Sequence, residues 1–244
     1  RYRVFYGEMQ ATADPRTLLR RRDADAFDRH CDHLLVLDHD DVEIRPFRKA
    51  RPRIVGTYRL LRQNVAERHR GFYTAGEFVI EPLLARHAGL EFLELGRSCV
   101  MKAYRSKRTV ELLWQGIWAY VLNNGVDAMI GCASFEGTDP DALALPLSFL
   151  HHHASADADW QVEARPERAV GMNRLPIEAV DMLAALAGMP PLIKGYLRLG
   201  AMVGRGAVVD RPFGTTDVMI VLPVDRISER YVRYYGADAS RYAA

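Results

Sequence analysis

The chain has 244 residues and a hydrophobic content of 49%, which is enough to bury the core of one large domain or two small ones. No apolar run reaches the length of a membrane-spanning helix and no signal peptide opens the chain, so we expect a cytoplasmic protein. The net charge of +2 singles out no partner, and three widely spaced cysteines fit neither a zinc knuckle nor a disulfide framework.

The first ten residues predict a helix, because Tyr2, Phe5, Tyr6 and Met9 give it an apolar side. The chain begins at Arg1 with this apolar segment, as if in the middle of an element. We therefore expect the N-terminal strand of the fold to be missing from the chain.

Residues 23–33 carry a density of carboxylates that packing alone rarely explains. The cluster suits a cationic amine, a metal held together with the neighbouring histidines, or the capping of a solvated turn. We favour amine binding over metal, because the spacing matches no recognised set of metal ligands. The carboxylates are Asp23, Asp25, Asp28 and Asp32.

A strand is predicted at residues 54–61, and it carries Arg59 near its end. A buried arginine is costly unless a carboxylate pairs with it, so its partner is either one of the preceding aspartates or a ligand. The aromatic segment at residues 71–79 suits a loop or strand that lines a pocket, and it contains Glu77 and Phe78. A short helix is expected at residues 81–89.

Residues 90–135 predict a strand, a helix and a second strand, around which the rest of the chain is arranged. The last part is almost wholly apolar, which is typical of a buried parallel pair joined by a helix on one face of the sheet. The loop before the helix therefore faces a ligand edge.

Glu94 and Arg97 lie three residues apart in the first of these strands, and strict alternation would put them on opposite faces. Gly96 lies between them. A β-bulge at Gly96 would bring both side chains to one face and would splay this strand from its neighbour, opening a slot between the strands. We predict this bulge.

Cationic side chains crowd the start of the central helix, where the helix dipole already disfavours cations. Together with the backbone N–H groups there, they suit a phosphate or pyrophosphate, and a solvated basic loop is the alternative. The side chains are those of Lys102, Arg105, Lys107 and Arg108. Further basic clusters at residues 16–22 and 45–53 suit an acidic protein or an anionic membrane surface, whereas nucleic acid is not expected.

Beyond residue 135 we expect further elements in one continuous domain, because no repeat or linker interrupts the chain. The histidine triplet at 151–153 cannot converge on one ion from a single helical face, so no metal site is expected. The amphipathic segment at 192–200 packs on the core or contacts a membrane. The elements are helices at 138–153, 177–187 and 192–200, and strands at 160–164, 170–173, 207–210 and 217–222.

Several segments of the chain carry a resemblance in combination. They are residues 1–6, 28–36, 56–61, 72–78, 94–100, 131–135, 137–140, 192–200 and 213–218. Together they resemble the acyl-carrier-protein-dependent N-acyltransferases that make lyso-ornithine lipid and related N-acyl amino acids, a group often labelled haemolysin-like. The match spans nearly the whole chain.

That group resembles the Gcn5-related N-acetyltransferase (GNAT) superfamily and, within it, the acyl-homoserine-lactone synthases. The resemblance implies an α/β (α+β) fold, with a GNAT-like mixed sheet splayed at a central parallel strand pair and helices on both faces. It places the acyl-pantetheine arm in the cleft. We expect a single GNAT-like domain over residues 1–244 with a C-terminal extension from about residue 140.

The activity that the resemblance implies is acyl transfer from the thioester of a 3-hydroxyacyl carrier protein to the α-amine of ornithine, which gives lyso-ornithine lipid. Residues 104–109 lack the glycine pair of the common acetyltransferase phosphate loop, so we expect a carrier protein rather than coenzyme A as donor. No cofactor is expected beyond the phosphopantetheine of the carrier protein. Because the product is an amphiphile, peripheral contact with the inner face of the cytoplasmic membrane stays open.

In this hypothesis Glu94 is the base, strand N–H groups around Ser98 are oxyanion donors, and Arg59 or Arg97 holds the substrate carboxylate. The expected catalytic residues are Glu94, Arg97 and Ser98. The expected donor-binding residues are Val100, Arg105, Lys107 and Arg108. The expected amino-acid-binding residues are Asp25, Asp28, Asp32, Arg59, Glu77 and Phe78.

Two alternatives stay open. The same fold is compatible with another acceptor, either a different amino acid or the adenosyl-methionine-derived precursor of a lactone signal. The chain is also compatible with a non-catalytic, membrane-active protein of the haemolysin-like type.

Overall fold

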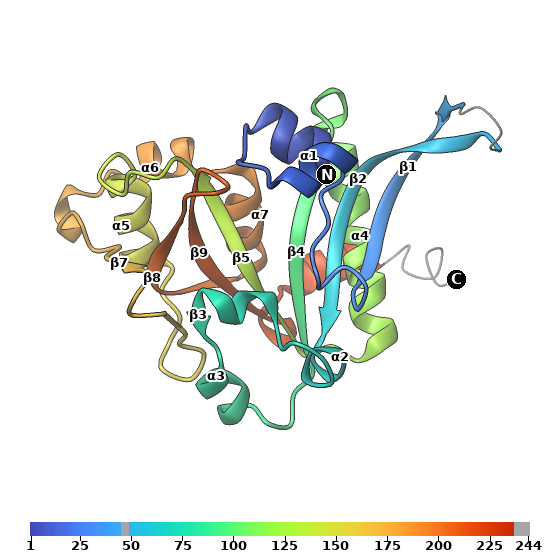
Figure 1. The fold of residues 1–244 in the computed structure, drawn as a ribbon. Coiled ribbons are helices and arrows are strands. Elements are labelled where there is room, and N and C mark those ends of the chain that lie inside the picture. Colours follow the sequence, from blue (N-terminus) through green and yellow to red (C-terminus); the bar gives the residue numbers. More distant parts are fainter. Residues whose placement is uncertain (45–48, 237–244) are drawn as a thin grey trace.

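The computed structural model describes residues 1–44 and 49–236, and these form one continuous mixed sheet with helices around it (Figure 1). The strands lie in the order β1-β2-β4-β5-β9-β8-β6-β3, and β7 pairs with β8. The strands are β1 (Asp32–Glu43), β2 (Arg51–Arg62), β3 (Phe78–Val79), β4 (Phe92–Val100), β5 (Ala128–Glu136), β6 (Glu163–Ala164), β7 (Ala169–Val170), β8 (Met202–Asp210) and β9 (Thr215–Pro223).

Helices cover both faces of this sheet, as expected from the sequence. The α-helices are α1 (Pro15–Arg20), α2 (Gln63–Glu67), α3 (Glu81–Arg86), α4 (Lys107–Asn124), α5 (Ala144–His153), α6 (Met182–Gly188), α7 (Pro191–Leu199) and α8 (Glu229–Gly236). A π-helix η1 (Arg3–Glu8) opens the chain, and single turns of 3₁₀ helix include η2 (Tyr73–Gly76) and η4 (Ile177–Ala179). On one face Leu93 and Leu95 of β4 pack with α4, α5 and α7. On the other face Phe92 packs with β3 and α3.

The central strand, helix and strand are confirmed as β4, α4 and β5. Ser106 caps α4 by accepting a hydrogen bond from the N–H of Thr109, and Gly125 ends the helix in the left-handed conformation. Most apolar residues of α4 at helical spacing, among them Leu113 and Ile117, are buried against the sheet, whereas Val110 in the first turn is exposed. The crossover therefore places the start of α4 beside the end of β4.

The predicted bulge is confirmed, and it lies one residue beyond the expected place. Arg59 of β2 pairs with Gly96, but Thr57 pairs with Cys99, so β4 has one residue more than β2 in this interval. Arg97 takes up the extra length with φ of 49°, a left-handed conformation that is uncommon for a non-glycine residue.

The predicted splay is confirmed between β4 and β5. These parallel strands pair only over three residues, from Phe92 with Ala128 to Glu94 with Ile130. Beyond that point β4 continues along β2 and β5 continues along β9 (Figure 1). The two halves of the sheet therefore diverge at Glu94.

Gly131 lies at the point of divergence and allows the close approach of the two strands before they part. A Cβ atom on Gly131 would lie 2.4 Å from the carbonyl oxygen of Leu95, which is backbone and cannot rotate away. We expect Gly131→Ala to lower the free energy of unfolding by about 1–3 kcal/mol, measured by urea denaturation. Gly171→Ala is the matched control, since its Cβ meets nothing within 4 Å; equal effects of both substitutions would contradict this role of Gly131.

Some C-terminal boundaries differ from those expected. The helix expected at 177–187 is divided into η4 and α6, because Asp181 stops the first turn and caps the second by accepting a hydrogen bond from the N–H of Ala184 at 3.0 Å. Helix α5 begins at Ala144 rather than residue 138, and Asp139 instead closes a turn with the N–H of Asp141. The outer strands β6 and β7 are shorter than predicted.

The amphipathic segment at 192–200 is confirmed as α7. Its apolar side packs on the core through Ile193, Tyr196 and Leu199, which are all buried. This side is therefore not free for membrane contact. Among the described residues, none of the helices combines the length and apolar character needed to cross a bilayer.

Candidate functional site

A cavity of about 230 Å³ lies where β4 and β5 diverge. Its walls come from η1, β2, η2, both diverging strands, α7 and the adjoining ends of β8 and β9. Glu94, Arg97 and Ser98 line it together with Arg59, so the predicted catalytic residues are brought to one place. Their roles stay predictions.

Glu94 is buried and fixed by the backbone of η2. Its Oε2 accepts a hydrogen bond from the N–H of Tyr73 at 2.9 Å, and its Oε1 accepts one from the N–H of Thr74 at 2.6 Å. Burial raises the pKa of Glu94 above its ordinary value, although a hydrogen bond from the Thr74 hydroxyl and the two from the backbone oppose the shift. A carboxylate accepts about four hydrogen bonds, so these three still leave a lone pair for a proton.

The Arg97 guanidinium lies between two aromatic rings, 4.9 Å from the centroids of both Tyr73 and Phe213. Its Nη2 lies 3.1 Å from Asp25 Oδ2, and its Nε lies 3.9 Å from Asp23 Oδ2 but makes no hydrogen bond of normal geometry among the described residues. Because Glu94 and Arg97 both contact Tyr73, the bulge has brought these side chains to the same face. A partly paired, buried guanidinium in a cavity wall suits an anionic or carbonyl group of a ligand.

Ser98, the third predicted catalytic residue, follows the bulge and hydrogen-bonds the buried Tyr58 hydroxyl. That hydroxyl also lies 3.4 Å from the hydroxyl of Tyr196. The side chain of Ser98 is therefore part of a polar contact between β2, β4 and α7, within the wall of the cavity.

The aspartates expected to bind an amine are instead occupied by arginines of the same chain. Arg59 Nη1 lies 2.8 and 2.6 Å from the two carboxylate oxygens of Asp25 and 3.2 Å from Asp28. Arg1 donates two hydrogen bonds to Asp28, at 2.8 and 3.0 Å. Burial alone would raise the pKa of Asp28, but the bond from Arg1 and its other partners lower it to about 2. Of the two partners expected for Arg59, a preceding aspartate or a ligand, the structure shows the aspartate.

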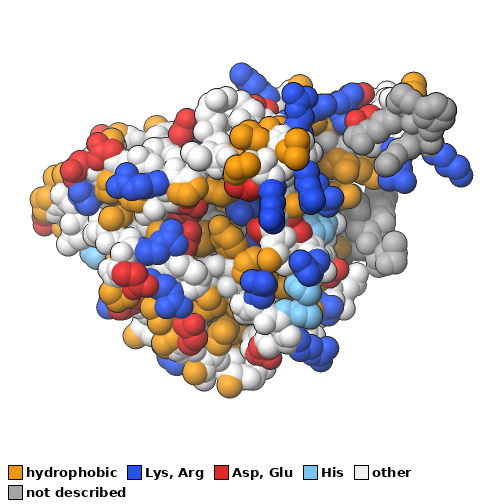
Figure 2. Space-filling view, viewed as in Figure 1, with side chains coloured by type: hydrophobic (Ala, Val, Ile, Leu, Met, Phe, Trp, Pro, Cys, Tyr) orange, Lys and Arg blue, Asp and Glu red, His pale blue; other side chains and the backbone are white. Residues whose placement is uncertain are grey.

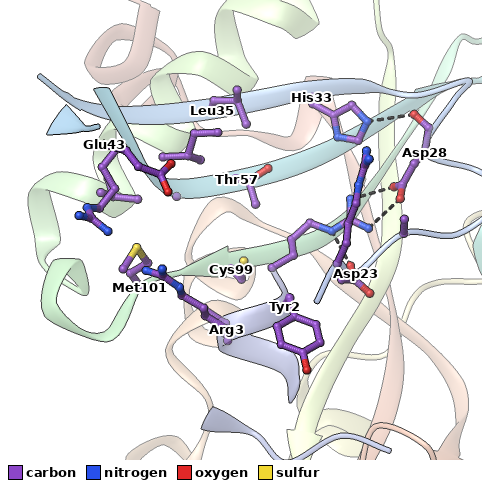
Figure 3. A pocket seen from close by; sticks show the side chains of 18 of the residues that line it. Tyr2, Arg3, Asp23, Asp28, His33, Leu35, Glu43, Thr57, Cys99 and Met101 are labelled. Carbon is purple, nitrogen blue, oxygen red and sulfur yellow. Dashed lines mark hydrogen bonds and ion pairs between the residues drawn. The ribbon is translucent and has the colours of Figure 1, made fainter. Parts of the chain in front are cut away.

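A larger cavity, about 1220 Å³, lies on the other side of this ionic network (Figure 3). Figure 3 shows Asp23 and Asp28 on one side and Arg3 and Met101 on another, with Cys99 between them. The expected amine-binding residues Asp25 and Asp28 line this larger cavity, whereas Arg59 lines the smaller one. The structure therefore divides the predicted amino-acid-binding residues between two spaces.

Two other predicted amino-acid-binding residues lie away from both cavities. Asp32 begins β1 and accepts a hydrogen bond from the Tyr120 hydroxyl of α4 at 2.6 Å. Phe78 is fully buried in the hydrophobic cluster under β3 and α3. Neither side chain lines the smaller cavity.

The expected donor-binding residues lie at the end of β4 and the start of α4. Arg105 donates to the carbonyl of Val100 at 3.1 Å and pairs with Glu8 at 2.5 Å. Lys107 is exposed and lies 3.5 Å from Glu111, and Arg108 is exposed beside it. Figure 2 shows further Lys and Arg side chains over α1 and the β1–β2 hairpin; residues 45–48 of the second basic cluster lie outside the described part of the chain.

Three buried carboxylates meet beside the smaller cavity, and two of them, Asp210 and Asp217, line it. Glu77 follows η2, Asp210 ends β8 and Asp217 lies near the start of β9. One oxygen atom from each lies within 4.8 Å of the others. Burial and the charge of Asp217 raise the pKa of Glu77 to about 7. Such a group of carboxylates suits a cation, either an ammonium or a metal ion.

The cysteines have the properties expected of buried thiols. Burial raises the pKa of Cys31 to about 12 and raises the pKa of Cys99 and of Cys132 above their ordinary value. A thiol with a raised pKa is protonated at neutral pH and is a poor nucleophile. None of the three therefore has the character of a catalytic cysteine.

Comparison with known proteins finds a matching family model and several proteins of similar sequence. The family model for the acetyltransferase (GNAT) domain matches residues 1–115. An L-ornithine N(alpha)-acyltransferase of Rhizobium meliloti (strain 1021) is 59% identical over 244 residues, which are 100% of this chain and 81% of that protein. One of Agrobacterium fabrum is 56% identical over 99% of this chain and 80% of its own length. Among solved structures, a CoA-dependent acyl-homoserine lactone synthase is 13% identical with a TM-score of 0.46, covering 96% of this chain and 78% of that one.

Proposed function

The chain belongs to the family of L-ornithine N(alpha)-acyltransferases, and we propose that it moves a 3-hydroxy fatty acyl group from the thioester of an acyl carrier protein to the α-amine of ornithine. The product is lyso-ornithine lipid and the free thiol of the carrier protein. The observation that carries this proposal is the cavity at the diverging strands, in which a buried carboxylate lies beside an irregular stretch of β4. The GNAT family match and the mixed sheet agree with an acyltransferase.

The reaction forms an amide bond and breaks a thioester bond. The α-amine must lose a proton before or while it attacks the thioester carbonyl, and the leaving thiolate must gain one. Glu94 is oriented by two backbone N–H groups and has a raised pKa, which makes it a stronger base than an exposed glutamate. In our proposal it accepts the proton of the amine.

The negative charge that develops on the carbonyl oxygen needs hydrogen-bond donors. Beyond Glu94 the ladder between β4 and β5 has ended, so N–H groups of β4 that face β5 are not used in that ladder. In our proposal those near the bulge, around Arg97 and Ser98, stabilise the oxyanion. The guanidinium of Arg97, which contributes to the same wall, holds the carboxylate of the amino acid.

The donor enters from the end of β4. A phosphopantetheine phosphate fits the start of α4, where the helix dipole and the side chains of Arg105, Lys107 and Arg108 favour an anion. The basic surface over α1 and the β1–β2 hairpin is complementary to an acidic carrier protein (Figure 2). In our proposal the protein needs no cofactor of its own, and it contacts the inner face of the cytoplasmic membrane peripherally to release its amphiphilic product.

An assay of thiol release from 3-hydroxyacyl carrier protein tests this function across a panel of amino acids. We expect release with ornithine and little with other amino acids or without an acceptor. Release with a different amino acid, or equal rates with acyl-coenzyme A, would contradict the acceptor or the donor respectively. Lysis of vesicles without any acyl donor would instead support a membrane-active protein.

Replacing Arg105 and Arg108 together by Ala is expected to raise the KM for the acyl carrier protein by about tenfold or more with little change in kcat, because a charge-assisted contact is worth about 1.5–3 kcal/mol. Initial rates of thiol release at saturating ornithine measure this. Arg205→Ala is the control, since its side chain is exposed on β8 beside Glu163. An unchanged KM in the double variant would contradict a phosphate-binding site at the start of α4.

A further inference from the structure

We propose that Glu77, Asp210 and Asp217 bind the side-chain ammonium of ornithine and thereby direct acylation to the α-amine. This inference rests on the proposed function and assigns the acceptor's second amine to residues that the sequence analysis did not select for it as a group. The three carboxylates, from the end of η2, the end of β8 and the start of β9, are called the acidic wall here.

The acidic wall is part of the reaction cavity. Asp210 and Asp217 line it, and Glu77 reaches it through Cys132, whose thiol lies 3.3 Å from Glu77 Oε2. The alternation of the strands puts these side chains on one face: Met219 of β9 packs on the same side as Ile130 of β5, and Asp217 is two residues from Met219. Glu94 points to that face from β4, since it binds η2.

The acidic wall is only partly compensated by positive charge. Among the described residues, the nearest cation is Arg168, whose Nη2 lies 3.6 Å from Glu77 Oε1, and no ion pair joins Asp210 or Asp217 to a basic side chain. One arginine therefore faces three buried carboxylates. By contrast, Asp25 and Asp28 are paired with Arg59, Arg97 and Arg1, so they offer little to a further cation.

One carboxylate oxygen of the acidic wall has no hydrogen bond of normal geometry among the described residues. It is Oδ1 of Asp217, a residue that is 6% exposed. The hydroxyls of Ser134 and Thr215 lie near the Asp217 carboxylate and oppose the rise of its pKa, but that of Thr215, 3% exposed, makes no hydrogen bond of normal geometry within the described part of the chain. A buried unpaired acceptor costs about 1–3 kcal/mol, and an ammonium with three N–H donors would satisfy it. The raised pKa of Glu77 and of Asp217, caused first by burial, is consistent with a site that awaits a cation.

Glu94 and the acidic wall are linked through a short chain of neighbouring side chains. Thr74 connects the two ends, because its N–H donates to Glu94 at 2.6 Å and its hydroxyl lies 3.8 Å from the Cys132 thiol, which in turn contacts Glu77. An amino acid whose α-amine lies beside Glu94 can therefore extend its side chain toward the acidic wall. Paired with carboxylates, the side-chain ammonium keeps its proton and is not nucleophilic, whereas the α-amine can lose its proton to Glu94.

Norvaline, which is ornithine without the side-chain amine, is the probe that tests this pairing. For the wild-type enzyme we expect kcat/KM with ornithine to exceed kcat/KM with norvaline by about a hundredfold or more. Norvaline would leave the buried carboxylates of the acidic wall without a cationic partner. Asp217→Asn is expected to lower kcat/KM for ornithine by about a hundredfold, mainly through KM, and to leave norvaline almost unchanged. Glu77→Gln is a second variant with the same expected pattern.

Controls separate this pattern from a general structural effect. Asp225→Asn, an exposed aspartate after β9, is expected to change neither substrate. Removing one of three repelling carboxylates should not lower the unfolding temperature, which thermal denaturation checks. Equal losses for ornithine and norvaline in Asp217→Asn and Glu77→Gln would overturn the inference, and so would unchanged discrimination in both variants.

Two further outcomes would also overturn it. Loss of wild-type activity on chelation, restored by Mg²⁺ or Ca²⁺, would show that the acidic wall binds a metal ion. Loss of discrimination in Asp25→Asn but not in Asp217→Asn would move the ammonium site to the aspartates near Arg59. Failure of wild-type enzyme to release thiol with ornithine at all would instead refute the proposed function, so the two failures are distinguishable.

Discussion

Replacing Glu94 by Gln is expected to lower kcat for thiol release by about 10²–10⁴-fold, the usual contribution of a positioned base. Glu94 is the carboxylate fixed by η2 at the point where β4 and β5 part. Its pKa is raised by burial, so its carboxylate takes up a proton from an ammonium more readily than an exposed glutamate does.

The pH profile of kcat shows whether Glu94 acts as a base or only fixes η2 in place. Below the pKa of Glu94 the carboxylate is protonated and cannot accept a proton, so wild-type kcat at saturating ornithine should fall on the acidic side. In Glu94→Gln the residual rate should lack that limb, while binding of the acyl carrier protein stays close to the wild-type value. Near-normal turnover, or an unchanged acidic limb in the variant, would remove Glu94 as the base.

Replacing Arg59 by Leu is expected to lower the free energy of unfolding by about 3–5 kcal/mol, because it leaves buried carboxylates without their partner. Arg59 is 2% exposed and contacts Asp25 and Asp28 between 2.6 and 3.2 Å. Its guanidinium also lies over the rings of Phe27 and Tyr73, at 5.6 and 5.3 Å. Urea denaturation measures the loss, and Arg205→Leu, which removes an exposed pair, should cost about 1 kcal/mol or less.

The same network gives a dependence of stability on pH with a definite sign. The pKa of Asp28 is lowered in the folded protein from 3.8 to about 2, and that of Asp25 is also lowered by Arg59 against the effect of burial. Groups with a lowered folded pKa stabilise the protein above their unfolded pKa and lose this contribution as pH falls toward the folded value. Wild-type stability should therefore fall between about pH 4 and pH 2. A fall of equal size in Arg59→Leu would contradict the assignment.

The sequence predicted β4, α4 and β5 correctly because each of these elements has a pattern that lies within a single segment of the chain. The apolar run of β5 and the helical spacing in α4 are properties of single segments, and Gly96 between Glu94 and Arg97 pointed to a bulge. The position of the bulge was wrong by one residue, because the left-handed conformation is adopted by Arg97 itself, which packs between Tyr73 and Phe213. Only tertiary packing decides this.

Local sequence patterns could not predict the acidic wall. Glu77 is far in the chain from Asp210 and Asp217, and only the order of β9 and β8 after β5 brings the three together. The dense aspartates at 23–28 were the stronger local signal, yet the structure pairs them with arginines of the same chain. One clue was available: the three polar residues Thr215, Thr216 and Asp217 open a strand that is apolar from Val218 onward.

The structure of the protein bound to a thioether analogue of 3-hydroxyacyl-phosphopantetheine tests the central claim most directly. We predict that the pantetheine arm lies between β4 and β5 beyond the pair of Glu94 and Ile130, with the carbon that replaces the thioester carbonyl beside Glu94 and the bulge at Arg97. An analogue seated instead in the larger cavity between β1, β2 and the N-terminal segment would contradict the account.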